Sequence, residues 1–202
     1  MTPQTCITTA RYLINDTDSV LYRQENAELL SYFNLGLKEA AKLSPDHFKT
    51  TGDFTCNANI TEQAIAFSDA QEFLGVIRIK DGKALHEMDM QALSQYNPDW
   101  ASDTAGTPQN WAKLNGEKLR FYLYPKPSTM QVLEVSYLRN PEEYELADSV
   151  TDVPATWETA LAWYIIHMAE MKDDEHVNSG RAVAAYQRFA TIITGAMPQA
   201  GG

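Results

Sequence analysis

The first clear pattern in the sequence is an apolar stripe with a helical period in residues 26–43. Apolar side chains recur there at i, i+3, i+7, i+10 and i+11, namely Leu30, Phe33, Leu37, Ala40 and Ala41. These spacings place them on one face of an α-helix. Asn26 is a candidate N-cap. The helix is expected to end at Ser44, because the proline that follows disfavours helical geometry in its predecessor.

Two more helical stripes lie near the C-terminus. One consists of Leu161, Tyr164, Ile165 and Met168, and the other of Ala182, Ala185, Tyr186, Phe189 and Ile193. The segment MKDDEHVNSG between them is short. Residues 171–180 are therefore predicted to join two antiparallel helices.

The middle of the chain changes to a period of two. FLGVIRIKDGKALHEM (73–88) and WAKLNGEKLRFYLYP (111–125) contain Asp81-Gly82 and Asn115-Gly116, dipeptides that favour two-residue hairpin turns. Each stretch is predicted to form two strands. In MQVLEVSYLR (130–139), Leu133, Val135 and Tyr137 alternate with other residues, which predicts a further strand.

Between the hairpins lies SQYNPDWASDTAGTPQN (94–110), which has many turn formers and no periodicity. An irregular loop of this length in a compact domain is usually functional or disordered. Trp100 lies within it and is a side chain that monomers normally bury. The loop is expected either to dock on another molecule or to fold back over the sheet.

These elements together predict an α+β protein. Residues 1–48 and 154–195 should form a helical bundle core, and residues 60–140 a β-rich insertion that carries the long loop 94–110. The polar residues 50–63 do not reveal how they pair. Residues 196–202, which contain glycine and proline and few apolar groups, should form a flexible tail.

Charge is unevenly distributed along the chain, whose formal net charge is −11. Residues 141–176 contain one base, Lys172, and these acidic residues: Glu142, Glu143, Glu145, Asp148, Asp152, Glu158, Glu170, Asp173, Asp174 and Glu175. Bases, among them Lys118, gather instead in residues 110–126. Because Lys and Arg neutralise phosphates when proteins bind nucleic acid, this acidic chain is a poor candidate for gripping DNA. The acidic segment is either a solvated face or a surface that repels nucleic acid or attracts a basic partner.

The sequence contains no recognisable catalytic motif. It lacks G-x-S-x-G, a glycine-rich phosphate loop, H-E-x-x-H and C-x-x-C. His86 and Glu87 are adjacent and would point to opposite faces of a strand. Residues 173–176 lack the alternating acidic spacing and the glycine of a calcium loop. We therefore expect no enzyme activity, no metal site and no cofactor.

The compartment can be inferred from the cysteines and the apolar runs. Cys6 and Cys56 have no spacing motif and are expected to be idle thiols in a reducing compartment. No apolar run approaches the roughly 20 residues that a membrane span needs. The N-terminus lacks the basic region and apolar core of a secretory signal. We expect synthesis in the cytoplasm and no membrane contact.

Three stretches carry a resemblance to a known family. The first is LINDTDSV (13–20), AELLSYFNLGLKEA (27–40) and LSPD (43–46); the second is FYLYPKP (121–127), with a partner strand at 132–139; the third is VPATWETALAWYIIHMAEMKDDE (153–175) with NSGRAVAAYQRF (178–189). Their order and spacing resemble those of the head-to-tail adaptor (connector or head-completion) proteins of tailed bacteriophages. The resemblance covers most of the chain.

The resemblance implies a structural virion protein at the head–tail interface. Twelve copies would form a ring between the portal ring and a tail or nozzle protein, and double-stranded DNA would pass through without specific binding. Adaptors of this kind commonly anchor on the portal through their C-terminal ends, which makes Phe189, Ile192, Ile193 and Met197 the candidate docking residues.

Further candidates are assigned within this picture. Asp81, Asn115, Lys118 and Trp100 are expected to contact neighbouring subunits or the tail. Glu142, Glu143 and Glu145 are candidates for the channel wall, where like charge would let DNA slide.

Two rival functions remain open. The first is an acidic intracellular regulatory module that binds a basic protein partner. The second, weaker rival is a small hydrolase that uses clustered carboxylates. Size under native conditions separates a monomeric or dimeric regulator from an adaptor that joins a portal ring.

Overall fold

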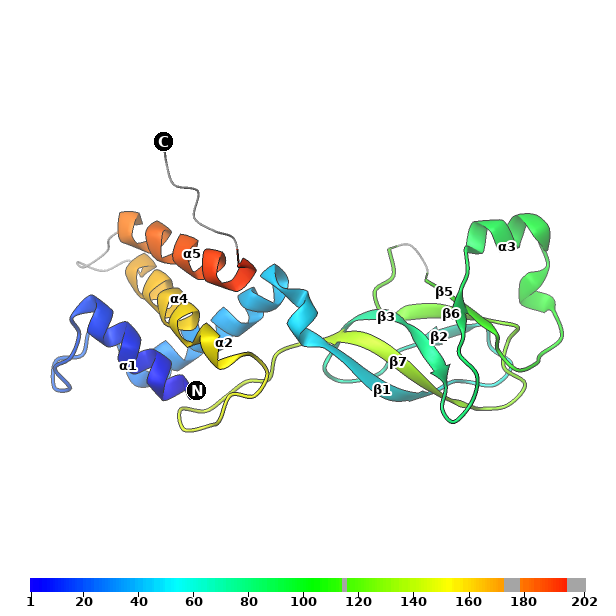
Figure 1. Cartoon of the computed structure of the whole chain (residues 1–202), viewed down its shortest axis with the longest axis horizontal. Coiled ribbons are helices and arrows are strands. Elements are labelled where there is room, and N and C mark those ends of the chain that lie inside the picture. Colours follow the sequence, from blue (N-terminus) through cyan, green and yellow to red (C-terminus); the bar gives the residue numbers. More distant parts are fainter. Residues whose placement is uncertain (114–115, 173–178, 196–202) are drawn as a thin grey trace. The chain divides into compact units, whose positions relative to one another are not determined.

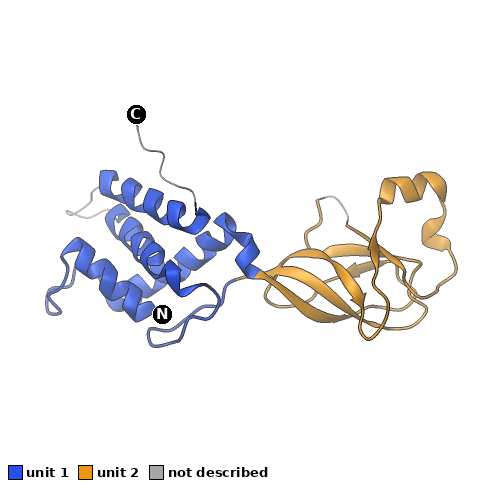
Figure 2. Ribbon diagram, in the orientation of Figure 1, with its two compact units in different colours: residues 1–48, 141–202 blue, residues 49–140 orange. Residues whose placement is uncertain are grey.

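The computed structural model describes residues 1–113, 116–172 and 179–195 (Figure 1). The chain divides into two compact units (Figure 2). Met1–Phe48 and Pro141–Gly202 form the helical unit, and Lys49–Asn140 form the β unit. The β unit therefore begins at Lys49 rather than at residue 60, and the chain returns to the helical unit at Pro141 rather than at residue 154.

The structure confirms the α+β class, since the long described helices lie in the helical unit and the described strands lie in the β unit. The helical unit contains α1 (Pro3–Ile14), α2 (Asn26–Leu43), η1 (Pro45–Phe48), η3 (Ala155–Trp157), α4 (Glu158–Met171) and α5 (Ser179–Thr194). α1 begins with a capping box, in which Thr2 and Thr5 each accept a hydrogen bond from the other's backbone N–H. It ends at Asn15, whose φ of 60° is left-handed.

α4 is the central helix of the helical unit. Apolar residues lie on nearly all its sides, which is the pattern of a helix buried by its neighbours. Its buried residues are Ala160, Leu161, Ala162, Tyr164, Ile165, Ile166, Ala169 and Glu170. α1, α2 and α5 all pack against it (Figure 1).

The predicted helical hairpin is confirmed. His167 Nδ1 lies 3.0 Å from the carbonyl oxygen of Ala182, and the rings of Tyr164 and Phe189 lie 4.9 Å apart. Contacts that pair later residues of α4 with earlier residues of α5 show that the two helices are antiparallel.

α2 packs closely on α4, as its apolar stripe predicts. Phe33 and Leu37 are fully buried in one core cluster with residues of α4 and α5. Gly36 permits the close approach, because a Cβ there would lie 3.0 Å from the ring of Tyr164. The predicted cap is wrong, since Glu25 occupies the N-cap position and Asn26 is the first helical residue.

Residues 141–153 have no regular structure but belong to the helical unit. Tyr144, Val150 and Val153 are buried in its core cluster. The backbone N–H of Tyr144 donates to Asn34 Oδ1 at 3.0 Å, and the Asn34 amide donates to the Tyr144 carbonyl oxygen at 3.1 Å. Residues 141–153 are thus held in the helical unit by their buried apolar side chains, and they are tied to α2 by the two hydrogen bonds of Asn34.

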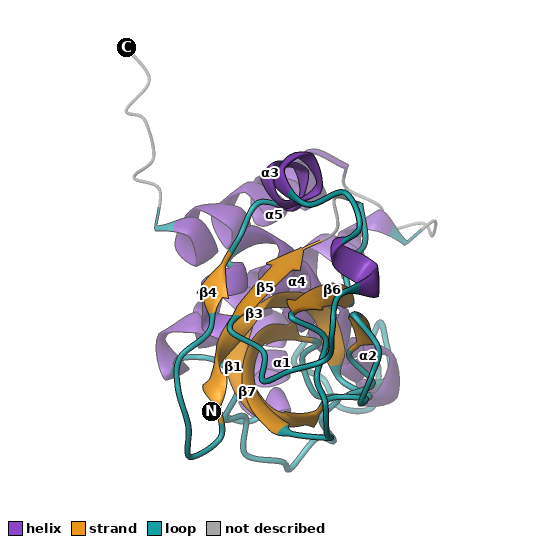
Figure 3. Cartoon of the chain, turned by 90° about the vertical axis from the view of Figure 1, so that its right-hand side faces the viewer, coloured by secondary structure: helices purple, strands orange, loops and turns teal. Residues whose placement is uncertain are grey.

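The β unit contains two sheets (Figure 3). Its strands are β1 (Lys49–Thr55), β2 (Glu62–Ala64), β3 (Ala70–Ile79), β4 (His86–Glu87), β5 (Asn110–Lys113), β6 (Arg120–Tyr124) and β7 (Val132–Arg139). One sheet has the order β1-β7-β3 and is antiparallel. The other has the order β2-β6-β5-β4, in which only β4 and β5 run parallel.

The core of the β unit comes from alternating residues of both sheets. Leu133, Val135 and Tyr137 of β7 are buried, as their alternation predicts. The rings of Phe73 and Phe121 stack at 4.4 Å. Because β3 and β6 belong to different sheets, this stacking joins the sheets across one apolar core.

Two strand pairings differ from the predictions. β7 pairs with β1 and β3, so it is not the partner of the aromatic strand β6. β5 and β6 do pair, but Lys113 lies opposite Phe121, which makes their connection longer than a two-residue turn. The turn at Asp81 is present, with the Ile79 N–H donating to the Lys83 carbonyl oxygen at 2.9 Å. The segment after this turn pairs with β3 only briefly, because His86 already pairs with Asn110 of β5.

The structure also shows how residues 50–63 pair. β1 lies along β7, with Lys49 opposite Leu138 and Thr55 opposite Val132. The turn that follows is organised by the buried Gln63, whose side-chain amide donates to the Ile60 carbonyl oxygen at 2.7 Å. A polar stretch can therefore form a strand here, because its buried polar groups are satisfied.

The packing of α2 yields a stability prediction. Phe33→Ala should lower the free energy of unfolding by roughly 3–5 kcal/mol, because it opens a cavity in the core. Leu35→Ala in the same helix is the control and should cost less than about 1 kcal/mol, since Leu35 is 42% exposed. Chemical denaturation measures both. Equal small losses would mean that α2 is peripheral to the core.

Candidate assembly surfaces

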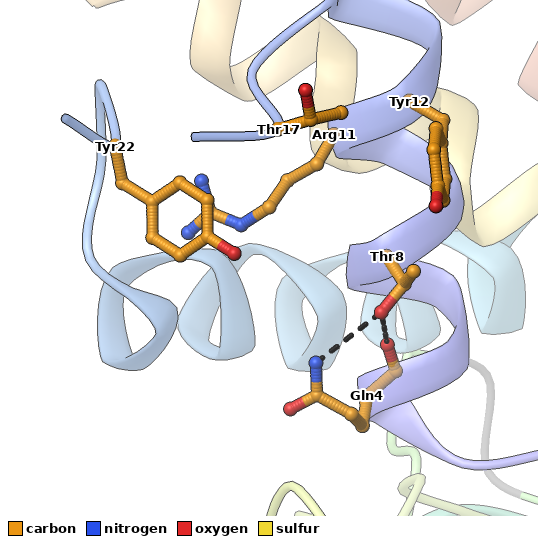
Figure 4. Close-up of a pocket in the computed structure, with 6 residues that line it drawn as sticks. All are labelled: Gln4, Thr8, Arg11, Tyr12, Thr17 and Tyr22. Atoms are coloured by element: carbon orange, nitrogen blue, oxygen red, sulfur yellow. Dashed lines mark hydrogen bonds between the residues drawn. The ribbon is translucent and has the colours of Figure 1, made fainter. Parts of the chain in front are cut away.

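Arg11 anchors the loop that joins α1 to α2 (Figure 4). Its guanidinium pairs with Asp16, and it donates to the Gln24 carbonyl oxygen at 2.6 Å and to Asn26 Oδ1 at 2.9 Å. The Tyr22 ring covers the guanidinium, with 3.5 Å between the guanidinium carbon and the ring centroid. A buried arginine with this many partners holds the loop in one conformation.

The cavity beside Arg11 has a volume of about 110 Å³ (Figure 4). It is lined by Gln4, Thr8, Arg11, Tyr12, Thr17 and Tyr22. Thr8 donates to the Gln4 carbonyl oxygen at 2.9 Å and accepts from the Gln4 amide at 3.3 Å. Since Gln4 and Thr8 bond each other and the guanidinium of Arg11 is paired with Asp16, we assign this cavity to support of the loop.

A second set of contacts ties the same loop to the end of α4. Arg23 and Gln24 both donate to the carbonyl oxygen of Ala169, at 3.2 and 3.3 Å. Glu170 is buried and lies 3.4 Å from an Arg23 nitrogen and 3.7 Å from an Arg181 nitrogen. Residues 15–25, named here the anchored loop, are thus fixed from both sides.

The tip of the anchored loop carries two exposed aliphatic side chains. Val20 is 86% exposed and Leu21 is 76% exposed. Asp18 shapes the tip, because its Oδ1 accepts the Val20 N–H at 3.0 Å and its carbonyl oxygen accepts the Leu21 N–H at 3.0 Å. A fixed loop that presents its apolar residues to solvent is suited to contact another protein.

A groove between α4 and α5 is the second surface of the helical unit. Its volume is about 480 Å³, and it is lined by Trp163, Ala184, Gln187, Arg188, Thr191 and Ile192. The Arg188 guanidinium lies over the Trp163 ring, 4.5 Å from its centroid. This groove, named here the α4–α5 groove, combines an aromatic floor with one positive charge.

The structure corrects the predicted docking residues at the C-terminus. Phe189 and Ile193 are buried in the helical core, so they are not available to bind a portal. Ile192 is 37% exposed and lines the α4–α5 groove. Met197 lies outside the residues that the structure describes.

In the β unit, the predicted loop 94–110 is partly helical. α3 (Met90–Tyr96) and η2 (Trp100–Ser102) interrupt it, and neither contains a buried residue. Tyr96 is 93% exposed. Trp100 is half-buried and meets Tyr122 edge-on, with ring centroids 5.6 Å apart. Residues 90–102, named here the α3 arm, therefore cover the sheet with Trp100 and expose Tyr96.

The predicted hairpin-tip residues are only partly described. Asp81 has a left-handed φ of 61° and is exposed. Lys118 is also exposed, while its carbonyl oxygen accepts the Phe73 N–H at 2.8 Å. Asn115 lies outside the described residues.

The candidate channel residues all lie on the surface of the helical unit. Glu142, Glu143 and Glu145 are exposed. Glu143 pairs with Lys38 at 2.7 Å, and this lysine lowers the pKa of the Glu143 carboxyl. Elsewhere in the predicted acidic segment, the carboxylate of Glu170 is buried against arginines.

Of the groups that suggested chemistry, His86 and Glu87 are exposed on β4, whereas residues 173–176 lie outside the described residues. Among the described residues, no three His, Cys, Asp or Glu side chains are placed to hold a metal ion. Both cysteines are buried free thiols, and burial raises the pKa of Cys6 to about 12. None of the described helices combines the length and apolar character that a membrane crossing needs.

Sequence reasoning missed the apolar tip and the α4–α5 groove. Val20 and Leu21 stand in a polar loop without periodicity, so no pattern marks them. Trp163 lies within an otherwise apolar helix, and its exposure depends on which faces α1, α2 and α5 cover. The only local sign of an exposed apolar tip was that Val20 and Leu21 follow Asp18 and Ser19, two residues that favour turns.

Comparisons with known proteins identify the family. No curated protein matches the chain. Among solved structures, the chain is similar to one described as "Neck of empty GTA particle computed with C6 symmetry", at 12% identity, covering 94% of this chain and 91% of that chain, with a TM-score of 0.30. It is also similar to "Neck of native GTA particle computed with C12 symmetry", at 12% identity and the same coverage, with a TM-score of 0.26.

Because both TM-scores are low, the assignment rests on the family comparison alone. A family model described as "SU10 adaptor protein" matches residues 1–202. This match covers the whole chain, including all three stretches on which the resemblance was based. The chain belongs to the SU10 adaptor protein family, as its resemblance to the head-to-tail adaptor proteins of tailed bacteriophages led us to expect.

Proposed function

We propose that this protein forms a ring between the portal and the tail of a virion and continues the DNA channel between them. Twelve copies are expected from the resemblance to tailed-phage adaptors. The observation that carries the proposal is the adaptor family match over residues 1–202, which assigns the chain a structural role between head and tail.

The distribution of apolar surface supports an assembly role. Each unit has its own buried core, so the fold itself does not require further partners. Large apolar side chains nevertheless remain exposed on both units, notably Val20, Leu21 and Tyr96. Such groups on fixed elements are typical of protein–protein contacts.

Portal docking is assigned to the residues after Gly195. Phe189 and Ile193 belong to the core and Ile192 to the α4–α5 groove, which leaves Met197 as the remaining predicted docking residue. Each copy would contribute one weak contact, and repetition around the ring would make the attachment firm through effective concentration.

The acidic segment suits a channel that DNA must pass without sticking. Binding sites for the DNA backbone are built from Lys and Arg, whereas Glu142 and Glu145 present carboxylates. Their exposure is what a channel wall requires. We place these residues and Glu143 on the inner wall of the ring.

Deleting residues 196–202 tests the docking assignment. The truncated protein should fold with an unchanged unfolding midpoint, because Ile193 and the Gly195 cap are retained. It should fail to join portal-containing heads, measured by co-sedimentation and by the fraction of completed heads. Normal head completion by the truncated protein would show that portal docking lies elsewhere.

Charge reversal tests the channel assignment. The triple substitution Glu142→Lys, Glu143→Lys and Glu145→Lys should leave the ring intact and slow DNA ejection, because lysines would bind passing phosphates. The matched triple Gln variant should be affected less, since it removes charge without creating phosphate sites. Ejection kinetics unchanged in both variants, with the ring confirmed, would place these residues on the outer wall.

Substitutions in the α3 arm test its proposed contact with a neighbour or the tail. Trp100→Ala should weaken association by about tenfold or more, as for a buried aromatic at an interface. Tyr96→Ala is the second variant of the α3 arm. The free energy of unfolding of this variant should equal that of the unmodified protein, because the Tyr96 side chain is 93% exposed. Calorimetry and sedimentation separate folding from association. A Trp100→Ala loss confined to monomer stability would assign Trp100 to the core of the β unit alone.

A further inference from the structure

The two surfaces of the helical unit differ in shape. The tip of the anchored loop is convex, with Val20 and Leu21 almost fully exposed. The α4–α5 groove is concave, with a volume of about 480 Å³. This volume falls within the range of roughly 300–1,000 Å³ found for ligand clefts, so the groove has room for two aliphatic side chains.

The tip keeps its shape without a partner. Arg11 and Arg23 fix the two ends of the loop, and the Asp18 carboxylate fixes the turn between them. Binding would therefore cost little ordering entropy. Burying Val20 and Leu21 would remove two of the most exposed aliphatic side chains of the described chain from water.

The surfaces also carry opposite charges. Asp18 is adjacent to the tip and exposed, and one of its oxygens accepts the Val20 N–H. Arg188 is exposed above Trp163, and no carboxylate in the described part of the chain forms an ion pair with it. The chain has a net charge of −11, so an arginine that lies over Trp163 without a carboxylate among the described residues is unusual on its surface. Such an arginine is complementary to a partner surface that carries a carboxylate.

One copy cannot fill its own groove with its own tip. The start of α5 lies beside the end of α1, from which the anchored loop departs, since Arg181 donates to the Leu13 carbonyl oxygen at 2.6 Å. Ile192 lies eleven residues further along the helix, or about 16 Å at 1.5 Å per residue. The loop and the last turn of α5 are at opposite ends of the helical unit (Figure 1). Any contact between tip and groove therefore joins two copies.

We propose that Val20 and Leu21 of one copy insert into the α4–α5 groove of the next copy, with Asp18 facing Arg188. Tip and groove are different patches on the same unit, so the contact is head to tail, and copies joined in this way close into a ring when the rotation allows it. This inference rests on the proposed ring and names the surfaces that would hold it together.

Cysteine cross-linking tests the contact directly. Leu21→Cys combined with Gln187→Cys places one thiol on the tip and one on the rim of the groove. Mild oxidation, with and without portal rings, should give a ladder of covalent oligomers extending beyond the dimer, because each copy carries both halves. The native Cys6 and Cys56 are fully buried and do not compete.

The matched control keeps the tip thiol and moves the second one. Leu21→Cys with Leu35→Cys uses an exposed position on α2 away from the groove. Oxidation of this control variant should give no covalent species larger than the dimer that two tip thiols form. No ladder from the first pair, or the same ladder from both pairs, would overturn the proposal.

Neutralising the charges provides a second measurement. Asp18→Asn keeps an acceptor for the Val20 N–H, and Arg188→Gln keeps a polar rim. Each should slow ladder formation by about two- to fivefold, and the double variant should be no slower than the slower single variant. Fully additive losses would show that the two residues do not face each other.

Failure of this contact and failure of the proposed function are distinguishable. If imaging shows a ring on the portal but no ladder forms, the ring stands and the tip–groove contact is wrong. If the unmodified protein forms no ring with the portal, the proposed function itself is wrong.

Discussion

Burial of α4 is the constraint on which the helical unit depends. This helix is apolar around most of its surface, so it must be enclosed by α1, α2 and α5. Two of these helices precede the β unit in the chain and one follows it. Enclosing α4 therefore brings the two parts of the helical unit together. It also fixes the positions of Phe48 and Pro141, the residues that flank the β unit. The β unit has its own aromatic core.

The polar contacts of the helical unit then determine what it presents to other proteins. Arg11, Arg23 and Glu170 join the anchored loop to α1 and to the end of α4, and this leaves Val20 and Leu21 in solvent. The same packing buries most of α4 and α5 and leaves the groove around Trp163 and Arg188. This arrangement is compatible with the structural role expected of an SU10 adaptor family member.

The sequence predicted those features that depend on local periodicity. Phe33 and Leu133 were assigned correctly because burial repeats at 3.6 residues in a helix and at two in a strand. Asn26 was misassigned because its side chain accepts a hydrogen bond from Arg11, a contact distant in sequence. Phe189 was expected to dock on a portal because the family resemblance implies anchoring through the C-terminal end, and its helical stripe does not reveal what covers it. The partners of β7 were missed, since strand pairing depends on non-local contacts.

The central claim is that this chain acts by assembling on a portal. The most direct measurement is a low-resolution image of the purified protein mixed with its portal ring, together with the native mass of each component alone. The account predicts a second layer of density that continues the portal channel, with several copies of the chain per portal. A protein that stays monomeric or dimeric and leaves the portal bare would contradict it, and would favour an acidic module that binds one soluble basic partner.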